Sequence, residues 1–279
     1  RGMEHDQPGV RMRALDVLMK GGIKRPDLDA LITRLEEEPR NAIRRRVLQA
    51  LRYFTGHGES EDVEAWKTFT RTLDPTWTSG ETVSSLRNRP NVHGQLGELD
   101  GLDPTSDRVA VLVDISTSYW GETASRNAMA RSVSPAVSRI IQRIDQTGSF
   151  LLVPFAEGPI PFSTKPIAAS PANVAKATSY LLDDMPNEPA REGSSNIVAA
   201  IDHALSFPEI DRIIIISASS EYVGEHADVA LMARLYEEQT RFRPAIFDFV
   251  LLNVADPDPP RWYKLANARG GRRFQLKVR

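Results

Sequence analysis

The stretch Arg108-Val-Ala-Val-Leu-Val-Asp114 is a continuous apolar run that ends in a carboxylate. A second run, Arg212-Ile-Ile-Ile-Ile-Ser217, ends in a hydroxyl. Runs that are apolar at every position are typical of strands in a parallel sheet that is covered on both faces. Helical and strand patterns alternate around these two runs, which predicts an α/β domain over residues 107–279.

Further elements can be assigned around these strands. We expect helices at 121–144, 171–182, 195–205, 227–240 and 260–268, and strands at 150–155, 245–253 and 273–278. A short antiparallel edge strand is expected at 159–163. Ligands of such sheets bind at the carboxyl ends of the strands, so Asp114, Ser217 and the loops beside them form the expected site.

Residues 8–73 show only helical patterns. The stretch VRMRALDVL from Val10 matches IRRRVLQAL from Ile43 at an offset of 33 residues. A self-match at this period predicts stacked helical-hairpin repeats, and the stretch Pro8 to Leu18 resembles HEAT-type α-repeats. The basic cluster is interpreted as a solvated helix face because acidic residues 36–38 stand before it; its members are Arg40, Arg44, Arg45 and Arg46.

Residues 74–106 carry scattered prolines and little periodicity, so we expect an irregular connector that packs on the second domain. The sequence therefore divides into a helical domain at 1–73, this connector, and an α/β domain at 107–279.

Composition excludes several classes of protein. The 37 acidic and 35 basic residues give a net charge of −2, which disfavours nucleic-acid binding. The absence of cysteine excludes disulfide scaffolds, zinc–thiolate sites and thiol nucleophiles. No apolar run approaches the ~20 residues of a membrane span, and the first residues lack the apolar core of a signal peptide.

Catalytic motifs find no support in the sequence. The histidines are scattered, without a His-Glu-x-x-His motif, at positions His5, His57, His93, His203 and His226. No phosphate-binding glycine loop and no nucleophile elbow occurs. His203, in an expected helix, is interpreted as structural.

The most informative constellation is Asp114-Ile-Ser116-Thr-Ser118, at the expected end of the first strand. One carboxylate and two hydroxyls at this spacing can project from one turn toward a common point. Oxygen ligands of this kind suit a hard cation such as Mg²⁺ or Mn²⁺. The alternative is that Asp114 and Ser116 only cap the following helix.

This constellation resembles the Asp-x-Ser-x-Ser signature of von Willebrand factor type A (vWA) domains. Further stretches resemble that family in the same order: Gly193 to Ile197, Arg212 to Ser217, and Arg269 to Phe274. The resemblance implies a Rossmann-like fold, with a mainly parallel sheet covered by helices on both faces.

The resemblance also implies a metal-ion-dependent adhesion site. Asp114, Ser116 and Ser118 match its first loop, and Ser195 stands where the family has a threonine. Ser195 has the alternative of capping its own helix. Ala218 stands where the family has its third-loop aspartate, which removes one carboxylate, and Glu221 is a candidate substitute.

The implied function is a non-enzymatic, adhesion-type protein-binding module. A protein partner would offer an acidic side chain to the bound Mg²⁺ or Mn²⁺, with Trp120 and Glu221 at the contact. The alternatives are a structural scaffold with a degenerate, metal-free site and, more distantly, a hydrolase. The pairing of α-repeats with such a domain resembles bacterial, often surface-associated or secreted proteins, which favours an extracytoplasmic location.

Overall fold

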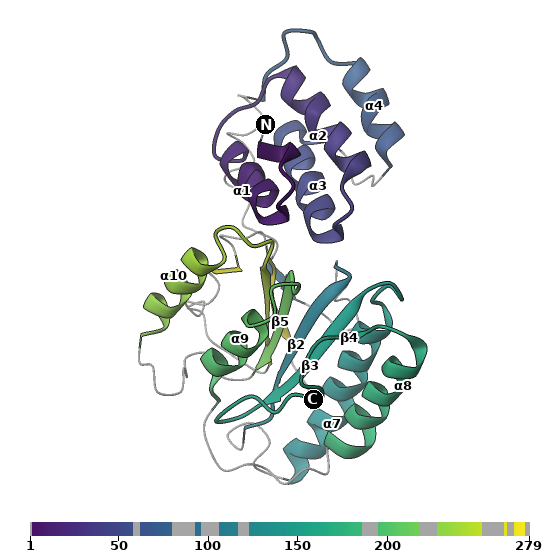
Figure 1. Cartoon of the computed structure of the whole chain (residues 1–279), viewed down its shortest axis with the longest axis vertical. Helices are drawn as coiled ribbons and strands as arrows, with labels where there is room; N and C mark the ends of the chain where they lie inside the picture. Colours follow the sequence, from purple (N-terminus) through teal and green to yellow (C-terminus); the bar gives the residue numbers. More distant parts are fainter. Residues whose placement is uncertain are drawn as a thin grey trace. The chain divides into compact units, whose positions relative to one another are not determined.

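The computed structural model describes residues 2–57, 62–79, 93–95, 106–116, 123–185, 195–217, 228–252, 265–266 and 271–276. The chain forms two compact units (Figure 1). The first contains Arg1–Val92 together with Gln239–Pro244, and the second contains His93–Glu238 and Ala245–Arg279. Among the described residues, no helix has the length and hydropathy that a membrane span requires.

The first unit is helical, as the sequence predicts. Its elements are a short 3₁₀ turn, η1 (Gly2–Glu4), and the helices α1 (Pro8–Leu18), α2 (Arg25–Glu37), α3 (Asn41–Thr55) and α4 (Val63–Arg71). Prolines lie in the first turns of α1 and α2, where no backbone N–H is needed. Gly56 ends α3 in the left-handed conformation, with φ at 65°.

The helices of the first unit share one apolar core. The predicted stripe on α2 is buried, at positions Leu28, Leu31, Ile32 and Leu35. It packs against α3 and α4, while α1 packs against α3. The four helices cover each other's apolar faces, as helices of a small domain must. The assignment of these helices to HEAT-type repeats stays a prediction.

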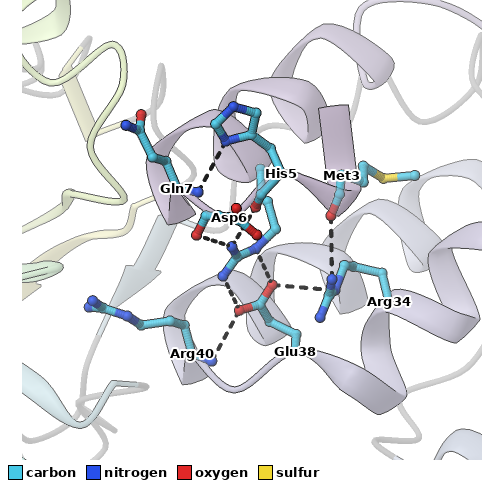
Figure 2. A network of polar contacts seen from close by, with 8 residues as sticks. Met3, His5, Asp6, Gln7, Arg34, Glu38 and Arg40 are labelled. Carbon is cyan, nitrogen blue, oxygen red and sulfur yellow. Dashed lines mark hydrogen bonds and ion pairs between the residues drawn. The ribbon is translucent and has the colours of Figure 1, made fainter. Parts of the chain in front are cut away.

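Buried ion pairs tie these helices together. Arg11 donates from Nε and Nη2 to the two carboxylate oxygens of Glu38, each at 2.8 Å. Figure 2 shows Glu38 between Arg34 and the backbone of Arg40, which donates to it at 3.1 Å. Arg46 donates to Asp16 at 2.8 Å and is also buried. The prediction that these arginines form a solvated helix face is therefore wrong for Arg46, because Asp16 neutralises the charge of Arg46 inside the unit.

The second unit contains a seven-stranded sheet in the order β1-β7-β6-β5-β2-β3-β4. The strands are β1 (His93–Gln95), β2 (Arg108–Asp114), β3 (Ser149–Phe155), β4 (Ile167–Ala168), β5 (Arg212–Ser217), β6 (Ile246–Leu252) and β7 (Arg273–Leu276). All described pairings are parallel except that of β4 with β3. The predicted α/β fold with a mainly parallel sheet is confirmed.

Helices cover both faces of this sheet because alternate strand residues point to opposite sides. Among the described residues the helices are α7 (Thr123–Gln142), α8 (Pro171–Ser179), the π-helical turn η3 (Tyr180–Asp184), α9 (Ile197–Leu205) and α10 (Val229–Gln239). Val111 and Ile214 share a core with α7 and α8. Leu112 and Ile215 share the opposite core with α9 and α10. Figure 1 shows α7 beside α8.

The expectations for the sheet edges are met only in part. Residues 159–163 do lie antiparallel to β3, with a bridge between Pro159 and Phe155, but the strand at this edge is β4. Ile160 and Phe162 do donate backbone hydrogen bonds to β3, but Pro159 and Pro161 alternate with them and lack the N–H that a ladder needs. At the other edge, β1 pairs with β7 within a segment that we expected to be irregular. Its three residues are too few to show a periodic pattern.

Candidate functional site

The candidate site lies at the carboxyl ends of β2 and β5. These strands are neighbours in the middle of the sheet. The strand that follows β2 in sequence, β3, lies on one side of this pair, and the strand that follows β5, β6, lies on the other side. This is the switch point at which doubly wound sheets bind ligands. Val113 pairs with Ile216, so the next residues along, Asp114 and Ser217, lie side by side. Alternate residues of each strand point to the same face of the sheet, so Asp114 and Ser217 lie on the face that α9 covers.

The Asp114 carboxylate is the centre of the site. Its Oδ2 accepts hydrogen bonds from the Ser195 hydroxyl at 2.7 Å and from the Ser217 hydroxyl at 2.5 Å. Its Oδ1 accepts the backbone N–H of Ser116 at 3.0 Å. All four residues are buried, with at most 1% of any of them exposed. Hydrogen bonds to an ionised carboxylate are short and strong, and they offset the cost of burying it.

Ser195 reaches Asp114 because another residue caps its helix. The N-cap of α9 is Asn196, whose side chain accepts the backbone N–H of Ala199 at 3.0 Å. The backbone of Asn196 also donates to Ala156 at 2.7 Å, which holds the start of α9 beside β3. The alternative in which Ser195 caps this helix is wrong, since its hydroxyl instead donates to Asp114.

The structure thus brings together three of the predicted site residues, Asp114, Ser116 and Ser195. Ser118, Trp120, Ala218 and Glu221 lie outside the described residues, and their roles stay predictions. The sequence places Ser217 in the expected site without a ligand role, and in the structure its hydroxyl contacts Asp114 directly. The sequence signal for this contact is the position of Ser217. It is the last residue of an apolar strand, and that strand lies next to the one that ends in Asp114.

The donors present have the chemistry of a hard-cation site. Among the described residues of the site they are one carboxylate and serine hydroxyls, with no nitrogen or sulfur donor, as Mg²⁺ and Mn²⁺ prefer. A hydroxyl that donates its proton to Asp114 still keeps two lone pairs for a cation. Among the described residues there is no group of three or more acidic or histidine side chains that would hold a metal ion. The ligands that the described residues offer a cation are one carboxylate and neutral hydroxyl oxygens.

A second polar cluster lies at the opposite end of β5 and was not predicted. Asp248, in the middle of β6, accepts from Arg212 at 2.6 Å and from Arg272 at 2.8 Å. Burial raises the pKa of Asp248, but the two guanidinium groups outweigh burial and hold that pKa below its ordinary value. An aspartate in an otherwise apolar strand is the signal for this cluster. Its burial and satisfied charges indicate a structural role.

His203 lies on α9 and is partly buried. Its ring meets the ring of Phe207 edge to face, with centroids 5.5 Å apart. Burial lowers the pKa of His203, which favours the neutral imidazole. These contacts agree with the structural interpretation of this histidine.

Comparisons with known proteins give likenesses of fold only. No protein-family model and no curated protein matches this sequence. A von Willebrand factor type A structure from Catenulispora acidiphila is 16% identical with a TM-score of 0.44, over 60% of this chain and 38% of that one. BatB from Bacteroides thetaiotaomicron is 15% identical with a TM-score of 0.42, over 61% of this chain and 90% of that one.

Proximal thread matrix protein 1 from the mussel byssus, in a structure with a zinc-occupied MIDAS motif, is 15% identical with a TM-score of 0.43. The match covers 71% of this chain and 48% of that one. This chain therefore spans less than half the length of the Catenulispora and mussel proteins that it matches. At these identities, the chain is similar to all three proteins in fold.

Proposed function

We propose that this protein is a non-enzymatic protein-interaction module that binds its partner through a divalent cation at the carboxyl ends of β2 and β5. The observation that carries this proposal is the convergence of the Ser195 and Ser217 hydroxyls on one oxygen of Asp114, at 2.7 and 2.5 Å. Such a cluster of buried oxygens at the switch point of the sheet is suited to a hard cation.

The cation is Mg²⁺ or Mn²⁺, and its proposed ligands are Asp114, Ser116, Ser118 and Ser195. Glu221 is a candidate for a further carboxylate, because Ala218 supplies none. The cation would neutralise Asp114 and present positive charge to an approaching partner. With Asp114 as its one carboxylate ligand, a bound divalent ion keeps a net positive charge, which a second carboxylate from Glu221 would cancel.

The partner that fits this charge is a protein with an exposed Asp or Glu side chain. A carboxylate is the ligand that a hard, incompletely neutralised cation binds most favourably. We propose that Trp120 and Glu221 contact the partner beside the cation, since aromatic residues are frequent anchors of protein interfaces.

The helical unit would position the α/β unit or add a second contact surface. We propose an extracytoplasmic location, which the sequence resemblance favours.

A matched peptide pair tests this function without a known partner. One fluorescent peptide library carries a fixed central Asp, and the second carries Asn at that position. We expect the full chain to bind Asp peptides in Mg²⁺, to release them in EDTA, and to discriminate against the Asn library. Asp114→Asn, which keeps the side-chain shape but removes the charge, is expected to abolish the Mg²⁺-dependent binding.

Binding of both libraries alike, or binding of Asp peptides unchanged by EDTA, would contradict this function. The second candidate, a metal-free scaffold, would then be favoured. A specific observation supports that candidate: Asp114 is already satisfied by two hydroxyls and one backbone N–H without any cation.

A further inference from the structure

We propose that the Ser217 hydroxyl is a direct ligand of this cation, and that it takes the coordination position left without a carboxylate at Ala218. This inference rests on the proposed function and names a residue that the sequence pattern does not assign as a ligand. It starts from the register of β2 and β5, which places Ser217 beside Asp114 on the face toward α9.

The hydrogen bond from Ser217 sets the direction of its lone pairs. A serine hydroxyl has one proton and two lone pairs. Ser217 commits its proton to Oδ2 of Asp114 at 2.5 Å, so its lone pairs point away from that carboxylate. A carboxylate that accepts a ligand's proton also makes the ligand oxygen a better electron donor, as outer partners do in other metal sites.

The Ser195 hydroxyl also donates a hydrogen bond to Oδ2 of Asp114, with the two oxygens 2.7 Å apart. One oxygen of Asp114 therefore orients two hydroxyls that come from different elements, the end of β5 and the residue before α9. Both hydroxyl oxygens lie close to that oxygen, so the two serines and Asp114 would hold a cation together. Asp114 then has a second role beside coordination, because it orients two hydroxyl ligands and supplies the negative charge.

The position of Ser217 is fixed by the sheet. It is the last residue of β5, which pairs on one side with β2 and on the other with β6. Its exposed fraction is 1%. A ligand on a strand that is held on both sides is preorganised, which lowers the cost of ordering it around a cation.

Replacing the ligand oxygen by sulfur tests direct coordination. Ser217→Cys places a soft donor at the same position, and the chain has no other cysteine. Full-length wild type, Ser217→Cys and Ser217→Ala are titrated with Mg²⁺, Mn²⁺ and Cd²⁺ by calorimetry. Ser138→Cys is the matched control, because Ser138 is a buried serine on α7 that hydrogen-bonds to Thr178 at 2.9 Å.

We expect Ser217→Cys and Ser217→Ala to bind Mg²⁺ at least about tenfold more weakly than wild type. Only Ser217→Cys should bind Cd²⁺ more tightly than wild type, because thiolate prefers softer metals. That binding should produce a thiolate-to-cadmium charge-transfer band in the ultraviolet. Ser138→Cys should leave Mg²⁺ affinity unchanged and show no such band.

Unchanged Mg²⁺ affinity in both Ser217 variants, or a Ser217→Cys variant without the charge-transfer band, would overturn the inference while leaving the proposed function intact. A wild-type protein that binds none of the three metals would overturn both. Ser217→Thr keeps the hydroxyl and is expected to bind Mg²⁺ like wild type, which separates loss of the ligand from general damage at the end of β5.

Discussion

The Ser195 hydroxyl donates a hydrogen bond to Oδ2 of Asp114 at 2.7 Å, across 81 positions of sequence. This contact joins the residue before α9 to the end of β2 and closes one side of the candidate site. It gives Ser195 a role in stability and, by our proposal, in cation binding. The two roles can be measured separately.

Ser195→Ala should lower the free energy of unfolding by about 1.5–3 kcal/mol, the usual range for a hydrogen bond to a charged group. It should also weaken Mg²⁺ binding. Urea unfolding measures the first effect and calorimetry the second. Ser195→Thr keeps the hydroxyl and should behave like wild type in the metal titration. If Ser195→Ala retained full Mg²⁺ affinity, Ser195 would not be a ligand.

Asp248 is predicted to make stability sensitive to acid. Burial raises its pKa, but Arg212 and Arg272 outweigh burial and hold the pKa in the folded state below the unfolded value of about 3.9. The stability that its charge contributes is therefore present above about pH 4 and lost as the pH falls through the folded-state pKa. Urea unfolding between pH 7 and pH 3 measures this loss.

Asp248→Asn should cost about 3–5 kcal/mol at pH 7, because it leaves two arginines beside a neutral amide. Its stability should also depend less on pH in the acid range than that of wild type. Asp29→Asn changes an exposed aspartate on α2 and serves as the control. Parallel pH profiles for wild type and Asp248→Asn would show that this carboxylate does not govern acid stability.

Glu38 is predicted to be the central charge of the helical unit. Its carboxylate accepts two hydrogen bonds from Arg11 and lies 3.4 Å from Nε of Arg34 (Figure 2). Glu38→Gln keeps the shape, removes the charge, and should cost about 3–5 kcal/mol by leaving Arg11 without its counter-ion. Glu37→Gln, at the exposed neighbouring position, should change the unfolding free energy little. Equal effects of the two substitutions in urea unfolding would refute this role.

Gly9 is predicted to be required by a close backbone approach. A Cβ at this position would overlap the carbonyl oxygen of Phe242, in the segment Gln239–Pro244 that belongs to the helical unit. Gly9→Ala should therefore destabilise the protein by about 1–3 kcal/mol despite the better helix propensity of alanine. Gly21→Ala, whose Cβ would meet nothing closer than 3.8 Å, should be tolerated. A thermal melt of each variant provides the comparison.

The long apolar strands were predictable because burial on both faces leaves a continuous signal. The run from Val109 to Val113 and the run from Ile213 to Ile216 both form central strands at the expected positions. β1 and β4 escaped prediction because strands of three and two residues carry no periodicity. The positions of β1 and β4 depend on pairing with β7 and β3, which lie elsewhere in the sequence.

The candidate site was predictable in part. Asp114 and Ser116 stand in a recognisable local pattern, and the resemblance added Ser195. The direct contact of Ser217 with Asp114 depends on strand register, which a single sequence does not give. The pairing of Arg46 with Asp16 was missed for a similar reason. An arginine on a helix has the same local pattern whether its counter-ion lies in solvent or on a neighbouring helix.

The most direct test of a cation site centred on Asp114 is a calorimetric titration of Mg²⁺ and Mn²⁺ into the metal-free protein and into Asp114→Asn. Our account predicts saturable binding to one site in wild type, and binding at least about tenfold weaker in the variant. Circular dichroism establishes that the variant is folded. Equal affinity in the two proteins, or no binding to wild type up to millimolar metal, would contradict the account.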